Sequence, residues 1–262
     1  MRILITNDDG INAKGLTALE EIARVLTDDI WVVAPEYEQS GASRALTLAD
    51  PLRVRRVGEH RFAVDGTPTD CVMLALQDLV TGKKPDLVLS GVNRGQNLAE
   101  DCSMSGTVAG AIQGMVLGVP SIAMSQALAV FRDDERAPFE TAVAHGPGIV
   151  QRLLEVGWPD DAIMNVNFPC CAPESVTQVE LTHQGFRGFI GLYAERRTDL
   201  RGRDYYWMGF RNGDVNLAQG SDLAAVSAGK VSVTPLHIDL THHAALAGLK
   251  GKIGGAIPKA YP

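Results

Sequence analysis

The sequence predicts an α/β protein: a three-layer α/β/α sandwich on a mostly parallel sheet, with an extended C-terminal arm. Short apolar runs alternate with segments of helical periodicity over about the first 185 residues. Strands that alternate with helices pair in parallel through right-handed crossovers, and the helices cover both faces of the sheet. The chain has 262 residues, of which 45% are hydrophobic and 21% charged, which is typical of a globular protein with a large core.

The predicted elements begin with a strand, a helix and a second strand, and a peripheral hairpin around Gly58 follows. Thr67, Pro68 and Asp70 are typical of a helix start, because they suit the cap, the first turn and the positive end of the helix dipole. Pro147 is expected to kink the last long helix. The expected strands are residues 3–6, 30–34, 52–57, 61–64, 86–90, 120–125 and 163–167, and the helices begin near residues 16, 67, 106 and 140.

The regular pattern ends near Gly185. Residues 187–220 are rich in glycine, arginine and aromatic side chains and show neither helical nor strand periodicity. Either this segment is an extended arm that packs on a partner subunit, or it is a long loop folded on its own core; both readings stay open on composition alone. Residues 231–236 predict a late strand before a tail of Gly, Pro and Lys. We therefore expect one domain, residues 1–262, with a core at about 1–185 and an arm and C-terminal segment at about 186–262.

Charge and cysteine content exclude several classes of protein. The formal net charge is −7 and no run of Lys or Arg is long, so a nucleic-acid polymer is not expected as a partner. The longest apolar stretch, residues 107–119, is too short to span a bilayer, and acidic residues follow Thr6 too closely for a signal peptide. We expect a cytoplasmic protein with reduced thiols at Cys71, Cys102, Cys170 and Cys171.

Polar residues follow three of the predicted strands. Asp8 and Asp9 end the first strand, where open α/β sheets bind ligands, although a carboxylate pair in a turn can also be a solvated cap. Ser40 lies beyond the second strand; a hydroxyl beside glycine is usually only part of a turn, but the end of a neighbouring strand can bring Ser40 close to Asp8. Asn93 and Asn97 lie in a glycine-rich stretch after the strand at 86–90; an ordinary turn is a stronger alternative for Asn97 than for Asn93.

A helix is expected to start at Ser105, Gly106 and Thr107. Its glycines at 106, 110, 114 and 118 form a smooth stripe that allows close packing on the sheet. The unpaired N–H groups at such a start suit a phosphate, whereas a plain Ser cap is the competing account. Together these groups offer oxygen ligands, which favour Mg²⁺ or Mn²⁺ over zinc. A dianionic phosphate about 5 Å from two carboxylates would be repelled by roughly 13 kcal/mol at an effective dielectric near 20, so a cation is needed.

Five motifs in order resemble the SurE family of survival proteins over almost the whole chain. They are N-D-D-G at 7–10, Q-S-G-x-S at 39–43, S-G-x-N-x-G at 90–95, S-G-T-V-x-x-A at 105–111 and V-S-V-T-P-L at 231–236. Met104 departs from the pattern, because the family usually has a ring at this position.

The resemblance implies a Rossmann-like sandwich and a metal-dependent phosphatase that hydrolyses nucleoside monophosphates. It places one divalent ion per subunit, Mg²⁺ or Mn²⁺, on Asp8, Asp9, Ser40 and Asn93. It also implies a 5′-nucleotidase in a homodimer or homotetramer that uses its C-terminal arm for oligomer contacts, with 3′-nucleotidase and exopolyphosphatase activity as further expectations.

The expected mechanism is in-line attack by a metal-activated water, with Asp8 and Asp9 as catalytic residues. Asn97, Ser105, Gly106 and Thr107 are the expected phosphate-binding residues. A covalent aspartyl intermediate is disfavoured, since it would normally require D-x-D rather than adjacent aspartates. A non-catalytic nucleotide sensor on the same scaffold is the alternative, and turnover of a phosphomonoester distinguishes the two.

Overall fold

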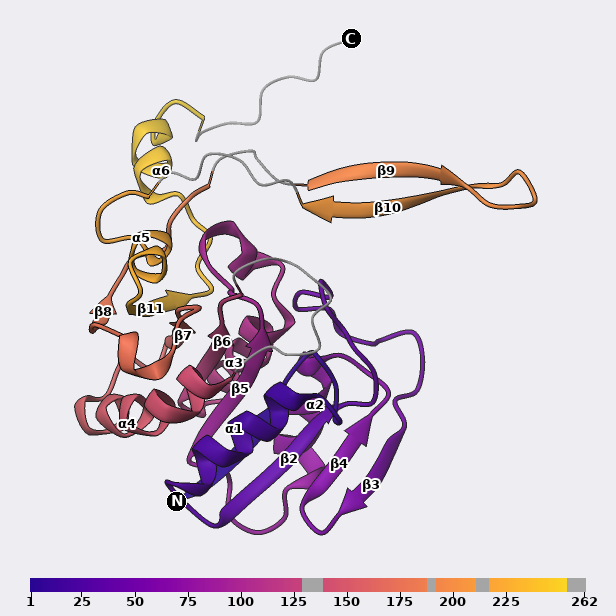
Figure 1. Cartoon of the computed structure of the whole chain (residues 1–262), viewed down its shortest axis with the longest axis vertical. Helices are drawn as coiled ribbons and strands as arrows, with labels where there is room; N and C mark the ends of the chain where they lie inside the picture. The colour runs from indigo at the N-terminus through magenta and orange to yellow at the C-terminus, as the bar shows by residue number, and fades with distance from the viewer. Residues whose placement is uncertain (129–138, 188–191, 211–216, 254–262) are drawn as a thin grey trace.

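The computed structural model describes residues 1–128, 139–187, 192–210 and 217–253 (Figure 1). Within these residues, one nine-stranded sheet forms the body and a separate two-stranded ribbon forms an arm. The sheet strands are β1 Arg2–Thr6, β2 Asp29–Pro35, β3 Val54–Gly58, β4 Arg61–Val64, β5 Leu87–Arg94, β6 Ser121–Gln126, β7 Ala162–Phe168, β8 Val179–Leu181 and β11 Val231–His237.

The strand order in the sheet is β3-β4-β2-β1-β5-β6-β7-β11-β8. The six strands from β4 to β7 are parallel to their neighbours, whereas β3 runs antiparallel to β4 and β11 runs antiparallel to β7. The carboxyl ends of β1, β2 and β5 therefore lie side by side near the middle of the sheet. Ligands of parallel sheets bind at the carboxyl ends of such strands.

Helices cover both faces of the sheet. Helices α1 (Lys14–Arg24) and α4 (Glu140–Val156) contact each other and pack on one face, and α2 (Pro68–Leu74) and α3 (Gly106–Val116) pack together on the other. Helix α5 (Asp222–Ser227) packs on β11 and β7. Short helical turns at Ala75–Leu79, Ala99–Ser103 and Pro173–Ser175 complete the body.

The apolar runs form strands because their alternate side chains enter two different cores. Ile3 and Ile5 of β1 belong to the cluster under α1 and α4, whereas Leu4 belongs to the cluster under α2. In β5, Leu87 and Leu89 likewise belong to the cluster under α1 and α4, and Val88 belongs to the cluster under α2. A strand buried on both faces is apolar at every position, and this is the pattern that predicts a central parallel strand.

The predicted three-layer sandwich is confirmed, with one difference in the elements of its body at β5. Strand β5 extends to Arg94 instead of ending at Ser90; its pairing with β6 shifts register between Ser90 and Asn93, so Asn93 lies in a strand end and not in a loop. The peripheral hairpin is confirmed. The helix start at Thr67 is also confirmed: the Thr67 hydroxyl accepts from the N–H of Asp70, and the Asp70 carboxylate accepts from the N–H of Thr67.

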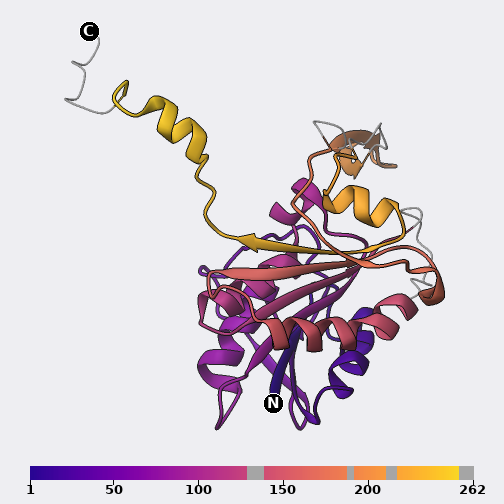
Figure 2. The ribbon, with the colours of Figure 1, turned by 90° about the vertical axis from the view of Figure 1, so that its left-hand side faces the viewer.

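The sequence pattern indicated no strand in the arm, but the structure contains two. Strands β9 (Leu192–Thr198) and β10 (Asp204–Phe210) form an antiparallel hairpin that projects away from the body (Figure 1). Helix α6 (His243–Leu249) also lies away from the body, beyond the end of β11 (Figure 2). No residue of α6 is buried. The hairpin does not fold back on the core of its own subunit.

Candidate active site

Asp8 and Asp9 occupy the turn that follows β1, at the carboxyl edge of the sheet. The side-chain amide of Asn7 donates to the carbonyl of Gly10 at 2.9 Å and closes this turn. Gly10 has φ 101°, a conformation that favours glycine, and its backbone lies against the segment after β2. The backbone of this turn is therefore fixed, and both carboxylates are presented at one place.

Asp8 is nearly buried, with 4% of its surface exposed. Its carboxylate accepts a 2.5 Å hydrogen bond from the hydroxyl of Thr107 on α3. A Cβ atom at Gly106 would lie 2.7 Å from the Cβ atom of Asp8, so only glycine allows this approach. The helix start and the first carboxylate thus form one unit, in which Gly106 and Thr107 hold Asp8.

Asp9 lies beside the end of β5. Its carboxylate accepts a 3.2 Å hydrogen bond from the backbone N–H of Arg94, which places it next to Asn93. The side-chain amide of Asn93 donates to the carbonyl of Gly95 at 2.8 Å. This bond turns the nitrogen of the amide toward Gly95 and leaves the oxygen as the atom that can face a cation.

Ser40 lies in the segment after β2, whose backbone contacts the Asp8 turn. The backbone N–H of Gln39 donates to the backbone carbonyl of Asp8 at 2.7 Å, so Ser40 follows a residue whose main chain is bonded to that of Asp8. The hydroxyl of Ser40 donates to the carboxylate of Glu38 at 2.8 Å. Glu38 was missed by sequence reasoning, although its charge acts on both Asp8 and Asp9.

The electrostatics of the pair favour a bound cation. Burial raises the pKa of Asp8, and the hydrogen bond from Thr107 opposes this effect. Burial, and then the charge of Asp8, raise the pKa of Asp9 to about 7. Two adjacent carboxylates in a buried turn are costly when both are charged, and a divalent cation relieves that cost.

The residues present fit a divalent oxygen-ligated ion. Within the described residues no three His, Cys, Asp or Glu side chains cluster as a metal site, so a cation here needs neutral oxygen ligands in addition to the two carboxylates. The segments that carry Ser40 and Asn93 are bonded to Asp8 and Asp9 and supply such oxygens. Hard oxygen donors of this kind suit Mg²⁺ or Mn²⁺.

The start of α3 lies directly against Asp8. Ser105 caps the helix, because its hydroxyl accepts from the N–H of Val108 at 3.0 Å. The Ser cap and the anion site were competing readings of the sequence, and the cap is present. Since the hydroxyls of Ser105 and Thr107 have these intramolecular partners, phosphate binding by residues 105–107 stays a prediction that rests on their backbone N–H groups.

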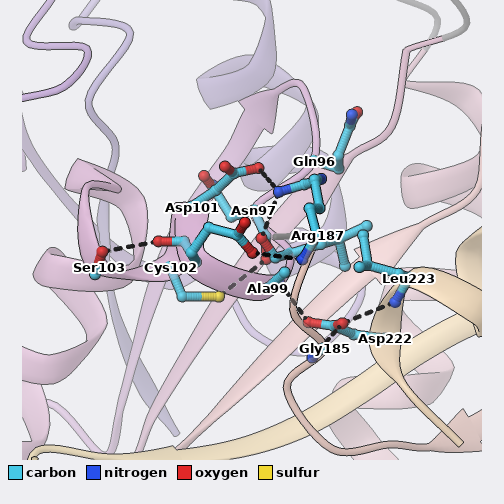
Figure 3. Close-up of polar contacts among 12 residues, drawn as sticks. Gln96, Asn97, Ala99, Asp101, Cys102, Ser103, Gly185, Arg187, Asp222 and Leu223 are labelled. Carbon is cyan, nitrogen blue, oxygen red and sulfur yellow. Dashed lines mark hydrogen bonds and ion pairs between the residues drawn. The ribbon is translucent and has the colours of Figure 1, made fainter. Parts of the chain in front are cut away.

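Asn97 lies in a buried polar network: its carbonyl accepts from the thiol of Cys102 (Figure 3), and its other partners lie on β6 and β7. Its side-chain amide donates to Ser125 on β6, and its backbone N–H and carbonyl bond to Asn167 on β7. Asn165 donates to the same carbonyl. Sequence reasoning missed both β7 asparagines, although polar residues at alternate positions of an apolar strand are a readable signal.

These features define a class of protein: an α/β sandwich that presents a carboxylate pair and a helix start at the carboxyl edge of its sheet. The profile of the family described as Survival protein SurE matches residues 3–190 of the chain. The protein belongs to this family.

Relatives and a solved structure match over nearly the full length. A protein of Caulobacter vibrioides (strain NA1000 / CB15N), named 5′-nucleotidase SurE, is 65% identical over 259 residues, 99% of this chain and 98% of the relative. A protein of the same name from Brucella canis is 52% identical over 254 residues, 97% of this chain and 99% of the relative. The crystal structure of the SurE protein from Aquifex aeolicus has a TM-score of 0.80 at 38% identity and covers 95% of this chain and 98% of that one.

In the part of the chain that the structure describes, none of the helices has the length and apolar character needed to cross a bilayer.

Proposed function

We propose that the protein is a divalent-metal-dependent nucleotidase, a phosphoric monoester hydrolase that acts on nucleoside 5′-monophosphates. The observation that carries the proposal is the buried Asp8–Asp9 turn, held against the start of α3 by Thr107 and Gly106. Relatives named 5′-nucleotidase SurE that match almost the full chain support the substrate class.

In this proposal Asp8, Asp9, Ser40 and Asn93 hold one Mg²⁺ or Mn²⁺ ion. When bound, such an ion polarises the phosphoryl group and lowers the pKa of a coordinated water. Thr107 keeps the Asp8 carboxylate in place by its hydrogen bond, and the N–H groups of Gly106 and Thr107 face the substrate phosphate. Asp9, which lies beside the end of β5, would orient the attacking water by accepting a hydrogen bond from it.

An assay of one nucleotide panel tests this function. Nucleoside 5′- and 3′-monophosphates, polyphosphate and p-nitrophenyl phosphate are incubated with Mg²⁺, with Mn²⁺ and with a chelator. Release of phosphate that needs the metal and is lost in Asp8→Asn is the expected result. Nucleotide binding without hydrolysis under any metal would instead identify the non-catalytic sensor and overturn the proposal. The panel also measures the preference for 5′ over 3′ esters and any exopolyphosphatase activity.

We also propose that the protein is cytoplasmic and assembles as a homodimer or homotetramer through the β9–β10 hairpin. Tyr206, Trp207 and Met208 expose 59%, 60% and 68% of their surface, although large apolar side chains are normally covered. An isolated two-stranded hairpin is marginally stable in water, so a neighbouring subunit that covers these side chains would stabilise it.

A further inference from the structure

The segment of residues 95–105 joins β5 to α3 and carries candidate phosphate-binding residues near both of its ends. Asn97 lies near its beginning and Ser105 at its end. The carbonyl of Asn97 accepts from the side-chain amides of Asn165 and Asn167, at 2.9 and 3.1 Å, which attaches the first end to β7. The conformation of residues 98–104 then determines where the start of α3 lies relative to Asn97.

Residues distant in sequence hold this intervening stretch. Arg187 pairs with Asp101 at 2.7 Å and donates to the carbonyl of Leu98 at 3.2 Å. The backbone N–H of Arg187 donates to the carboxylate of Glu100 at 3.0 Å. We call residues 183–187 the strap, because they cross the segment and bond to it at several successive positions (Figure 3).

Ala99 is the point at which the segment depends most on outside contacts. Its φ is +53°, in the left-handed region that an L residue with a Cβ rarely adopts. The N–H of Ala99 donates to the carboxylate of Asp222 at 2.8 Å, and its carbonyl accepts from the side chain of Gln184 at 2.8 Å. Both backbone polar groups of this residue are therefore bonded to the C-terminal part of the chain.

Asp222 joins the segment to the strap. It is fully buried, and its second oxygen accepts from the N–H groups of Gly185 and Leu223 at 2.8 and 2.7 Å. A Cβ at Gly185 would lie 2.8 Å from that oxygen, so a glycine is needed for the strap to come this close. The three backbone N–H donors offset the free-energy cost of burying the negative charge of Asp222, and each hydrogen bond fixes the direction of its donor.

We propose that Asp222 is a positioning residue of the candidate phosphate site, because its bond to Ala99 holds the segment that sets Asn97 relative to the start of α3. The inference rests on the proposed function. The side chain of Asp222 accepts from Ala99, Gly185 and Leu223, and none of these hydrogen bonds involves the four candidate metal ligands. Its loss should therefore weaken phosphate binding and leave metal binding unchanged.

The test uses Asp222→Asn in the full-length protein. In the orientation that keeps the bonds from Gly185 and Leu223, the new amide nitrogen faces the N–H of Ala99, so only the bond to the segment is lost. The matched control is Thr182→Val, which removes the buried hydroxyl contacts to Ser232 and Thr234 and touches nothing in residues 95–105. Asp222→Ala, which removes all three bonds, is the second variant.

For Asp222→Asn we expect KM for p-nitrophenyl phosphate to rise about tenfold with a smaller change in kcat, as for lost ground-state binding. The Kd of inorganic phosphate for the Mn²⁺-loaded protein, from calorimetry, should rise in parallel, and the Kd of Mn²⁺ alone should not change. Hydrogen exchange of the amides at 98–103 should accelerate. Thr182→Val should lower Tm without any of these changes.

Unchanged KM and unchanged phosphate affinity in Asp222→Asn, with a Tm loss like that of the control, would overturn the proposal and leave Asp222 with a structural part only. The phosphate titration does not require turnover. If the wild-type protein hydrolyses nothing, the proposed function fails, while weaker phosphate binding and faster exchange in Asp222→Asn still support the positioning role. A wild-type protein that hydrolyses nothing and binds no phosphate overturns both.

Discussion

Single residues decide whether the site can hold a cation, and Asp9 is the most informative of them. Its pKa of about 7 without metal means that the folded protein keeps a proton there which the unfolded chain loses near pH 4. The stability contributed by this proton is complete below pH 4 and is lost as the pH rises through 7. The metal-free protein should therefore become less stable over this range because of Asp9.

Asp9→Asn should remove this dependence. In chelator-treated protein the variant should have a higher Tm than the wild type at pH 8, and the difference should shrink toward pH 5. Thermal denaturation of both proteins at matched pH values measures the difference, so that titration of all other groups cancels. A difference in Tm that is the same at pH 5 and pH 8 would show that the pKa of Asp9 is not raised in the folded protein.

The four candidate ligands could be proposed from sequence because each follows an apolar run in a recognisable motif. The structure puts their segments in contact, through bonds such as that between Arg94 N–H and Asp9. Glu38 and Asp222 could not be found in this way. Asp222 contacts Ala99 across 123 positions of sequence, and local spacing carries no information about such a contact.

At the level of elements, the close packing of helix α3 on the sheet explains why the helix needs its glycines. A Cβ at Gly114 would lie 2.8 Å from Val88 and 2.4 Å from Ser121 in the sheet below, and one at Gly110 would lie 2.8 Å from Ser90. The smooth stripe predicted from sequence is therefore confirmed for these positions. Gly118 differs, because it follows the helix end with φ 71°.

Gly114→Ala should destabilise the protein by roughly 1–3 kcal/mol, because the added methyl group must push α3 away from the sheet. Gly148→Ala is the matched control. A Cβ there meets nothing within 4 Å in the exposed middle of α4, so this change should stabilise by about 0.5–1 kcal/mol. Chemical denaturation of both variants gives the two free energies of unfolding. If both substitutions change the free energy of unfolding in the same direction, close packing is not the reason for the glycine stripe.

Burial explains which elements the sequence could predict. Strands β1, β2, β5 and β6 are apolar because helices cover both faces of the sheet, and they were expected within a few residues of their bounds. The β9–β10 hairpin was missed because both of its faces are exposed, so no alternation of apolar and polar residues marks it. Periodicity reports which side chains are covered, and an element without a covered face gives no such signal.

At the scale of the whole molecule, the residues that the structure describes form a body that carries the site and two projections from it, the hairpin and α6 (Figures 1 and 2). Tyr205 and Trp207 contact each other edge to face on one side of the hairpin, and Tyr206 and Met208 alternate with them. Apolar side chains exposed on both sides of an arm are expected to be covered in an oligomer.

Replacing these four side chains by serine should convert the protein to monomer while the body stays folded. Light scattering at micromolar concentration measures the mass, and circular dichroism checks the fold. Leu200→Ser, at the exposed tip of the hairpin, is the control and should leave the mass unchanged. A monomeric wild-type protein would show that the arm has no partner in another copy of the chain.

The central claim, that one divalent ion lies between the ends of β1, β2 and β5, is tested most directly by anomalous diffraction from crystals soaked in Mn²⁺. We expect one peak per subunit, with oxygens of Asp8, Asp9, Ser40 and Asn93 at about 2.0–2.4 Å, and no peak in crystals of Asp8→Asn. A Mn²⁺ concentration that supports full activity but gives no peak at these residues, or a peak elsewhere, would contradict the account.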